Sequence, residues 1–417
     1  MLPAIICGAL AVLSLAITLW QWIVGRRFPL HRRVANPAFA PGITVLKPLK
    51  GCDAETAACL RSWLDQDYGG PVQVLFGINS AEDPVGDVVR SLLAARPGFE
   101  AQLVVCGQAL GANAKVSTLA QLEGRMQHDV VVISDADVRV PRDFLANVVA
   151  PLCDPEVGLV NCFYRLANPT TLAMKGEAVG INADFWSQVL QAQSLKPLGF
   201  ALGAAMATRR QQLQDIGGFR ALADYLADDY ELGHRVAAGG KGIVLSTVVV
   251  ECWSRPMTFG QVWSHQLRWS RTIRVCQPLP YFCSILSNAT LWPLLWLMWG
   301  LGSGSVTVEH SPLQAVGPGL TETWAIALPW TLAVIAGCLA VRILTALNLQ
   351  ARLTQSHCHY PDWWLVPIKD LLGAAIWALA FLGRRVEWGG RWFRVRQGGK
   401  LVETQPGQDA ITRVYHL

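Results

Sequence analysis

Long stretches without a charged side chain are the feature that most limits how this chain can fold. Residues 1–24 and 275–300 contain no Asp, Glu, Lys or Arg, and further apolar runs cover about 324–341 and 363–383. About 20 consecutive apolar residues can cross the hydrocarbon core of a bilayer as a helix. Between the first two runs lie about 250 residues of ordinary globular composition. The pattern predicts an integral membrane protein with one sizeable water-exposed domain.

The first apolar run predicts an uncleaved transmembrane anchor over residues 1–25 rather than a secretory signal peptide. No basic residue precedes the run, and no small-residue cleavage site follows it. The basic residues come afterwards, and they are Arg26, Arg27, His31, Arg32 and Arg33. By the positive-inside rule, this order places the large domain in the cytoplasm. We therefore expect a multi-pass protein of the cell inner membrane.

Cysteine usage and net charge exclude several other classes of protein. The 11 cysteines form no C-x-x-C pair, so in a cytoplasmic domain we expect reduced core residues rather than disulfides or metal ligands. The net charge of +5 is modest, and many basic residues flank the apolar runs, where anionic lipid headgroups suffice as partners. No basic–aromatic pattern indicates nucleic acid as a partner.

From residue 43 onwards, short β-rich runs alternate with helical stretches. The predicted strands are ITVLKPLKG, which we expect to end at Pro48, and then VQVLFGIN, AQLVVCG and DVVVISDADV. Near-continuous apolar strands in such an alternation predict a mostly parallel, Rossmann-like α/β sheet that helices cover on both faces. We place this domain at residues 40–255. In sheets of this kind, ligands bind at the carboxyl ends of the strands.

The second half of the predicted domain continues with strands and helices. VGLVNCFYRL and GIVLSTVVV are typical of strands, and helices are expected at about 170–193 and 228–238. Residues 256–280 are rich in Trp and Arg, which both favour the membrane interface, so we expect interfacial helices there.

The C-terminal part is predicted to enter the membrane again. We expect two transmembrane helices in residues 281–345, a membrane-associated or re-entrant helix at 362–383 and a basic cytoplasmic tail at 384–417. Four full crossings would put the arginine-rich tail outside, against the positive-inside rule. We therefore favour three crossings, with Lys369 and Asp370 on the fourth, non-crossing helix, because charges at membrane depth are usually paired or functional.

Two aspartates follow directly after the apolar strand VVVIS, at Asp135 and Asp137. Carboxylates at i and i+2 around a strand end can jointly hold Mg²⁺ or Mn²⁺ and leave positions free for phosphate oxygens. Alternatively, they are solvated turn residues. Their place at the carboxyl end of a predicted sheet strand favours the metal site.

Acidic residues are also concentrated at the start of the predicted helix 228–238. Asp228, Asp229 and Glu231 could merely complement the helix dipole. The functional alternative is that Asp229 points into a cleft as a general base, which deprotonates an acceptor hydroxyl.

Two further polar residues lie near predicted element ends. Lys115, in Gly111-Ala112-Asn113-Ala114-Lys115, is close to a helix N-terminus and suits an anionic diphosphate, although it could be a solvated lysine. Asp83 follows the strand VQVLFGIN and could be an N-cap or turn residue.

The interfacial segment carries His265, Arg268 and Trp269. Arg268 and Trp269 could anchor a helix at the membrane surface. Arg268 could also clamp a phosphate through two hydrogen bonds, and Trp269 could offer a flat face to a ring.

The order of these motifs resembles that of the processive-type, inverting GT-A-fold glycosyltransferases, whose pattern is D, D-x-D, D and Q-x-x-R-W. More narrowly, the chain looks like the ceramide glucosyltransferase family and its bacterial relative, the hopanoid-biosynthesis glycosyltransferase that modifies bacteriohopanetetrol. The resemblance covers roughly residues 1–400. The stretches that carry it are LKPLKG at 46–51, EDP at 82–84, Gly111-x-x-x-Lys115, SDADVRV at 134–140, LADDY at 226–230, His265-x-x-Arg268-Trp269 and FLGRR at 381–385.

The resemblance implies a UDP-sugar donor that carries glucose or N-acetylglucosamine, a hydroxyl of a membrane lipid (hopanoid or ceramide) as acceptor, and a β-glycolipid product. It implies a cytoplasmic catalytic domain with Asp229 as the catalytic base and with Asp135 and Asp137 as ligands of Mg²⁺ or Mn²⁺. The nucleotide sugar would be bound by Asp83, Lys115 and Asp135, and the acceptor or diphosphate side would be lined by His265, Arg268 and Trp269.

Two positions depart from or sharpen the family pattern. His265 stands where family members often carry Gln or Arg, so its charge would depend on pH. Asp137 is present, whereas some eukaryotic ceramide enzymes lack the second aspartate, and its presence favours direct metal ligation.

Two other functions remain open on the sequence. A processive β-polysaccharide synthase shares the same carboxylates, but its translocation channel needs more than three or four membrane helices. A non-catalytic membrane nucleotide-binding protein is the other alternative, and the presence of every expected carboxylate argues against it.

Overall fold

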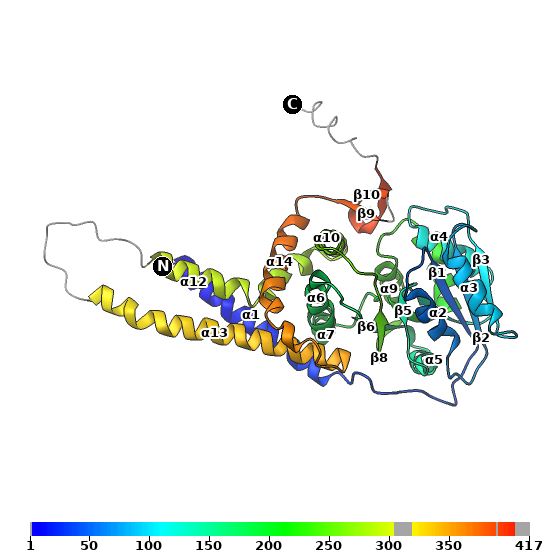
Figure 1. Cartoon of the computed structure of the whole chain (residues 1–417), viewed down its shortest axis with the longest axis horizontal. Helices are drawn as coiled ribbons and strands as arrows, with labels where there is room; N and C mark the ends of the chain where they lie inside the picture. The colour runs from blue at the N-terminus through cyan, green and yellow to red at the C-terminus, as the bar shows by residue number, and fades with distance from the viewer. Residues whose placement is uncertain (1, 304–318, 389–390, 405–417) are drawn as a thin grey trace, which may run out of the picture. The chain divides into compact units, whose positions relative to one another are not determined.

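The computed structural model describes residues 2–303, 319–388 and 391–404 (Figure 1). The chain divides into two compact units. The helical unit comprises Met1–Arg27, Lys175–Gln191 and Leu279–Leu379, and the α/β unit comprises Phe28–Met174, Ala192–Pro278 and Ala380–Leu417. Each unit is therefore built from segments that are far apart in the sequence.

An eight-stranded sheet forms the centre of the α/β unit, in the order β3-β2-β1-β4-β7-β6-β8-β5. The pairs β3–β2, β2–β1, β1–β4 and β6–β8 are parallel, whereas β7 and β5 pair antiparallel with their neighbours. The strands are β1 (Ile43–Leu49), β2 (Val72–Ile78), β3 (Ala101–Val105), β4 (Val130–Ser134), β5 (Val138–Arg139), β6 (Val157–Leu166), β7 (Ala205–Arg209) and β8 (Gly242–Cys252).

Helices pack around this sheet, and Figure 1 shows α2, α3 and α4 beside the strands β1, β2 and β3. All five residues of β4 are buried, as are all seven of β1. Such two-sided burial explains why these strands are continuous apolar runs. The helices of the unit include α2 (Thr56–Leu64), α3 (Val85–Ala94), α4 (Ala114–Glu123), α5 (Phe144–Val149), α8 (Arg210–Asp215), α9 (Asp228–Ala238) and α10 (Phe259–Cys276).

The sheet confirms the predicted α/β class, and two details differ from the expectation. The first strand does not end at Pro48, because its parallel pairing with β2 continues to Leu49, which lies opposite Ile78. The segment GFALGAAMATRR contains β7, which enters antiparallel between β4 and β6. The parallel pattern is therefore strongest in the first half of the sheet.

The basic tail forms a small sheet of its own, which its charge pattern did not indicate. The antiparallel strands β9 (Arg385–Trp388), β10 (Arg391–Val395) and β11 (Leu401–Glu403) pair in the order β11-β10-β9. Their buried side chains form a cluster that also includes Leu226, and its other members are Val386, Phe393, Val395 and Leu401. Residues 405–417 of the predicted tail lie outside the described residues.

Backbone hydrogen bonds join this small sheet to the segment before α9. The N–H of Leu226 donates to the carbonyl of Gly399 at 3.2 Å, and the N–H of Leu401 donates to the carbonyl of Asp224 at 2.7 Å. The small sheet therefore holds the segment that leads into Asp228 and Asp229.

The helical unit contains two helices that are long and apolar enough to span a membrane within the described residues. They are α1 (Leu2–Arg27) and the part Thr331–Thr354 of α13 (Gly319–Thr354). A third span is possible if the pair Pro278–Ser287 and Leu291–Trp299, which is bent by 59°, crosses as one. The helix α14 (Leu365–Ala380) has 16 residues, or about 24 Å, which is shorter than the roughly 30 Å hydrocarbon core. Its predicted re-entrant or interfacial position remains a prediction.

Glycines allow α1 to pack closely in this unit. A Cβ atom on Gly25 would lie 2.7 Å from Leu349 Cδ2 and 3.1 Å from the ring of Trp186. Small residues at helix contacts are typical of membrane helix packing, where close van der Waals contact replaces the hydrophobic effect. Trp22 Nε1 adds a hydrogen bond to Asn348 Oδ1 at 2.9 Å.

We expect Val395→Asp to release the small sheet from the segment before α9. Val395 is fully buried, so the substitution puts an unpaired charge into an apolar cluster. The expected result is at least ten-fold faster amide hydrogen exchange at Leu226 and its neighbours, measured by mass spectrometry. Arg394→Asp is the matched control, because Arg394 is exposed on the same strand and should change exchange by less than two-fold. Equal exchange in both variants would contradict the docking.

Candidate functional site

A salt-bridge network at one end of the sheet joins the end of β4 to the helices α4 and α9. Asp135 follows β4, Asp228 is the first residue of α9, and Lys115 lies in the first turn of α4. Lys115 Nζ is 2.7 Å from Asp135 Oδ1 and 3.1 Å from Asp228 Oδ2. The structure thus joins the predicted lysine to the D-x-D motif and to the acidic start of α9.

Electrostatics at Lys115 favour its charged form. Burial opposes the charge, but Asp135 and Asp228 outweigh it and hold the pKa of Lys115 above its ordinary value. The ammonium group therefore remains a fixed positive charge between two carboxylates, at the place where an anion could approach.

Asp229 lies next to this network without a salt bridge of its own among the described residues. Its Oδ1 accepts the N–H of Tyr230 at 2.8 Å. Burial and then the neighbouring Asp228 raise the pKa of Asp229 to about 6. A carboxylate with such a pKa is ionised at neutral pH and is basic enough to take up a proton.

Asp137 is solvent-accessible, although many protein atoms surround its carboxylate. The desolvation caused by these atoms, and next the negative charge of Asp135, raise the pKa of Asp137 to about 6. The carbonyl of Asp137 accepts the N–H of Trp253 at 3.0 Å, which fixes the turn after β4. The two carboxylates of the D-x-D motif therefore repel each other across a fixed turn.

Lys47 is a site residue that we did not predict. It lies in the middle of β1, is fully buried, and donates to Ser134 Oγ at 3.3 Å and to the carbonyl of Asp135. Burial lowers its pKa to about 8. A lysine inside the apolar run ITVLKPL was the available signal, because a buried lysine needs a nearby anion.

The loop before β7 touches both acidic segments. The N–H of Asp135 donates to the carbonyl of Ala204 at 3.2 Å. A Cβ atom on the adjacent Gly203 would lie 2.7 Å from Asp229 Oδ2. The absence of a side chain at position 203 therefore lets the backbone come this close to the Asp229 carboxylate without displacing it.

The loop at 111–115 is held by the segment that precedes α9. Asn113 caps α4 by accepting the N–H of Val116 at 3.0 Å, and its Nδ2 donates to the carbonyl of Tyr225 at 2.8 Å. The N–H of Ala112 donates to Asp224 Oδ1 at 3.1 Å. These contacts place Lys115 beside Asp228. The role of Asn113 was not predicted, although Asn before a helix is a frequent N-cap signal.

Asp83 makes the backbone contacts that are expected of an N-cap or turn residue. Its carboxylate oxygens accept the N–H of Gly51 at 3.0 and 3.1 Å, and Oδ1 also accepts the N–H of Val85 at 3.1 Å. Gly51 has a φ of +66°, a conformation that favours glycine. Asp83 thereby ties the end of β1 to the start of α3, and its role toward a nucleoside stays a prediction.

His265, Arg268 and Trp269 share the helix α10, in which the rings of His265 and Trp269 lie 4.5 Å apart. The far end of this helix reaches α9, because the hydroxyl of Tyr230 donates to the carbonyl of Cys276 at 3.2 Å and accepts from Gln277 Nε2 at 2.7 Å. The contact lies beside Asp229. The predicted roles of the three residues remain predictions.

The donor set fits a divalent cation at the D-x-D motif. Within the described residues, no group of three or more His, Cys, Asp or Glu side chains is arranged as a ready metal cage. Mg²⁺ and Mn²⁺ are often held by one or two carboxylates, with water and phosphate oxygens as the other ligands. The acids Asp135, Asp137, Asp228 and Asp229 outnumber Lys47 and Lys115, so the site carries a negative surplus that a cation would offset.

We expect Asp229→Asn to stabilise the protein at neutral pH. The raised pKa of Asp229 means that its ionisation opposes folding above about pH 6, and the effect disappears as the pH falls toward 4. Asparagine removes the charge, so the free energy of unfolding should rise by about 1–3 kcal/mol at pH 7.5. Thermal unfolding in detergent micelles at pH 7.5 and pH 4 measures the difference. Asp87→Asn, on the exposed surface of α3, should leave the midpoint unchanged at both pH values.

Several solved structures resemble this chain. A mannosyltransferase from Pyrobaculum calidifontis, in complex with GDP-Man and Mn²⁺, matches 89% of this chain and 98% of its own, with 20% identity and a TM-score of 0.49. Glucosyl-3-phosphoglycerate synthase from Mycobacterium tuberculosis, in complex with Mn²⁺, UDP and phosphoglyceric acid, matches 58% of this chain and 83% of its own, with 18% identity and a TM-score of 0.39.

Sequence relatives are found among ceramide glucosyltransferases. Ceramide glucosyltransferase 1 of Caenorhabditis elegans is 26% identical over 229 residues, which are 53% of this chain and 47% of that protein. The ceramide glucosyltransferase of Komagataella phaffii is 27% identical over 160 residues, which are 35% and 31% of the two chains. The chain thus matches about half or less of the length of these curated relatives.

The model of one protein family extends over almost the whole chain. Glycosyl transferase family 21 matches residues 6–401, a range that includes the sheet, the acidic site, the apolar helices and most of the small C-terminal sheet. The chain therefore belongs to glycosyl transferase family 21.

Proposed function

We propose that this protein transfers a hexose from a UDP-sugar to a hydroxyl group of a membrane lipid and inverts the anomeric configuration. The observation that carries the proposal is the network at Lys115, which joins Asp135 to Asp228 beside the basic carboxylate of Asp229. Family membership and the ceramide glucosyltransferase names of the relatives support a sugar donor and a lipid acceptor. The sugar would be glucose or N-acetylglucosamine, and the lipid ceramide or a hopanoid.

In the proposed reaction, Asp229 takes the proton of the lipid hydroxyl. The oxygen attacks the anomeric carbon from the face opposite the diphosphate, and the bond between that carbon and the diphosphate oxygen breaks. UDP leaves with the electron pair of that bond. A single displacement of this kind converts an α-linked donor into a β-linked product.

Positive charge beside the departing diphosphate would stabilise its developing negative charge. Lys115 is a fixed cation in the site, and Arg268 on α10 is a second candidate. A divalent cation bound by Asp135 and Asp137 would supply additional positive charge toward the diphosphate oxygens. Asp83 would act near the nucleoside, and His265 and Trp269 near the acceptor.

The number of membrane helices disfavours the processive synthase. Within the described residues, two helices, or three if the bent pair crosses as one, are long and apolar enough to span a bilayer. A polysaccharide channel would need more helices than this. The apolar helices would instead keep the site close to a lipid acceptor, and such confinement lowers the entropic cost of the encounter.

The first test concerns the base. Because the pKa of Asp229 is about 6, the transfer rate should rise with pH up to about 6 and level off above it, as the carboxylate must be ionised to accept a proton. Asp229→Asn should lower kcat at least about 100-fold and leave UDP binding intact. Sugar transfer from UDP-glucose to ceramide in membranes, with calorimetric UDP binding alongside, measures both quantities.

Glu231→Gln is the matched control for this test. Glu231 lies in the same first turn of α9 and pairs with Arg235 at 2.8 Å. If the acids served only the helix dipole, both variants would lose activity to a similar and small extent. Transfer that survives in Asp229→Asn would show that the base is misassigned.

The second test concerns the metal. We expect UDP to bind at least ten-fold more tightly with Mn²⁺ or Mg²⁺ than with EDTA, because the cation would join the diphosphate to the acidic turn. Asp137→Asn should remove most of that difference, while Asp67→Asn, at an exposed ion pair with Arg142, should preserve it. Calorimetry on full-length protein in detergent micelles gives the affinities. Equal UDP affinity with and without EDTA in the unaltered protein would rule out the metal-bridged site.

A further inference from the structure

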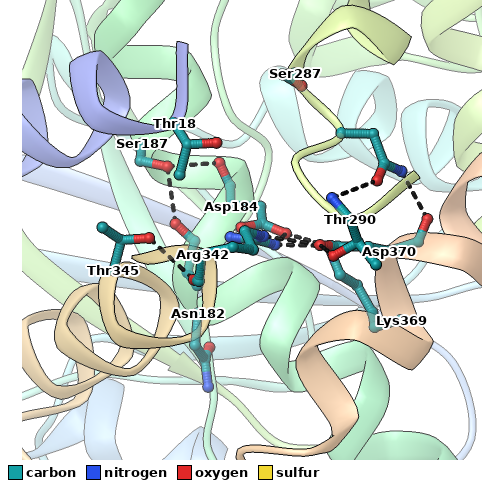
Figure 2. Close-up of polar contacts among 12 residues, drawn as sticks. Thr18, Asn182, Asp184, Ser187, Ser287, Thr290, Arg342, Thr345, Lys369 and Asp370 are labelled. Carbon is teal, nitrogen blue, oxygen red and sulfur yellow. Dashed lines mark hydrogen bonds and ion pairs between the residues drawn. The ribbon is translucent and has the colours of Figure 1, made fainter. Parts of the chain in front are cut away.

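The helical unit contains a polar cavity that the proposed chemistry does not use, and Figure 2 shows the charged side chains that line part of it. Its volume is about 160 Å³, whereas a water molecule in the liquid occupies about 30 Å³. Charged residues from three separate segments line it, and they are Asp184, Arg342, Lys369 and Asp370. The cavity is therefore large enough for a polar fragment of several heavy atoms.

The four charged residues form a closed ionic network. Arg342 Nη2 donates to Asp184 Oδ2 at 2.9 Å and to Asp370 Oδ1 at 2.8 Å, and its Nε donates to Asp370 Oδ2 at 2.8 Å. Lys369 also pairs with both aspartates. Asp370 is only 4% exposed and Arg342 only 6% exposed. Two acids and two bases give the network a net formal charge of zero.

Other elements of the unit hold this network in place. Thr290 Oγ1 donates to Asp370 Oδ2 at 2.7 Å, and Asn288 Nδ2 donates to the carbonyl of Asp370 at 2.8 Å. Asp184 lies in a π-helical turn, η2 (Gly180–Phe185), inside an otherwise α-helical segment. Single π-helical turns are rare in proteins, and those that occur are often found at functional sites.

A network needed only for stability would be expected to be dry and closely packed. Asp184, Arg342 and Asp370 are buried, and Lys369 is partly exposed. Burying charges among apolar helices is costly even when they are paired, and apolar replacements of similar volume are often at least as stable. Here the paired charges line an open volume instead of filling it. The arrangement is more consistent with a binding site than with a structural ion pair.

The charge balance selects the chemistry of the ligand. An anionic group would face Asp184 and Asp370, and a cationic group would face Arg342 and Lys369. A neutral group with both donors and acceptors can bond to either sign without a net repulsion. Trp377, which also lines the cavity, adds an aromatic surface. We propose that this cavity binds the neutral, hydroxyl-bearing headgroup of a membrane lipid, at a site separate from the acceptor position beside Asp229 in the proposed function.

The test fills the cavity without breaking the ionic network. Gly373 lines the cavity, and a Cβ atom there would meet nothing within 4 Å, so Gly373→Leu should occupy open space. Gly337 in α13 also has no neighbour within 4 Å of a Cβ, but it does not line the cavity, which makes Gly337→Leu the matched control. Both proteins are used full length in detergent micelles, with thermal unfolding as a check of folding.

Binding is measured without UDP-sugar, by the fluorescence anisotropy of a labelled N-hexanoyl ceramide, with 1-monooctanoylglycerol as a second neutral competitor. We expect Gly373→Leu to bind at least ten-fold more weakly than Gly337→Leu. We also expect sphingosine, which is cationic, and hexanoyl ceramide 1-phosphate, which is anionic, to compete at least ten-fold less well than the neutral lipids. Similar binding by the two variants, or best competition by a charged lipid, would overturn the proposal, as would saturable binding of neither neutral lipid.

Lys369→Met provides a second test if Gly373→Leu does not fold. The substitution leaves the network with a net negative charge, so sphingosine should gain at least five-fold in competition relative to ceramide. An unchanged order of competition would refute the site. Because these assays need no sugar transfer, they are independent of the catalytic proposal. If UDP binding proved independent of metal while ceramide binding stayed intact, only the catalytic proposal would be refuted.

Discussion

A surplus of negative charge at the end of β4, held together by two lysines, is the constraint on which the site depends. Lys115 connects Asp135 to Asp228 by direct ion pairs. Lys47 holds the turn after β4 by donating hydrogen bonds to Ser134 Oγ and to the carbonyl of Asp135. Four carboxylates so close together would repel one another without these cations. Burial, and next the neighbouring carboxylates whose charge the lysines offset only in part, keep the pKa values of Asp137 and Asp229 raised. The remaining negative charge makes the site suitable for a divalent cation.

The two units use buried charge in different ways. In the α/β unit, acids exceed bases, so the site favours a cation, which in the proposed function would bind a diphosphate. In the helical unit, Arg342 and Lys369 balance Asp184 and Asp370, so the cavity has no preference for a charged ligand. Both arrangements follow one rule, because a buried charge is tolerated only where a partner or a ligand neutralises it. The sign of the imbalance then indicates what each site can bind.

The segment before α9 connects several features that are remote in the sequence. Asp224 and Tyr225 receive hydrogen bonds from the loop that carries Lys115, while Asp224 and Leu226 are joined to the C-terminal sheet. The C-terminal sheet therefore supports the position of Lys115 and the start of α9 through one shared segment. The C-terminal segment, which the sequence predicted to be only a basic tail, therefore helps to hold the candidate site in place.

Much of the architecture followed from local pattern. The apolar strands, the helix at 228–238 and the D-x-D at a strand end were predictable, because burial on both faces imposes continuous apolar runs and ligands gather at the ends of parallel strands. The antiparallel entry of β7 was not predictable, since a five-residue strand pairs in either direction equally well by composition.

The partners of the charged residues were decided only by the tertiary structure. The sequence by itself determined that Lys47, Asp184 and Arg342 are charges within apolar or helical surroundings, and that each therefore needs a neutralising contact. It did not determine which contact, because Asp184 and Arg342 are 158 residues apart and Lys47 and Asp135 are 88 apart. Side-chain pairing over such separations depends on how strands and helices pack in three dimensions, and no local pattern encodes it.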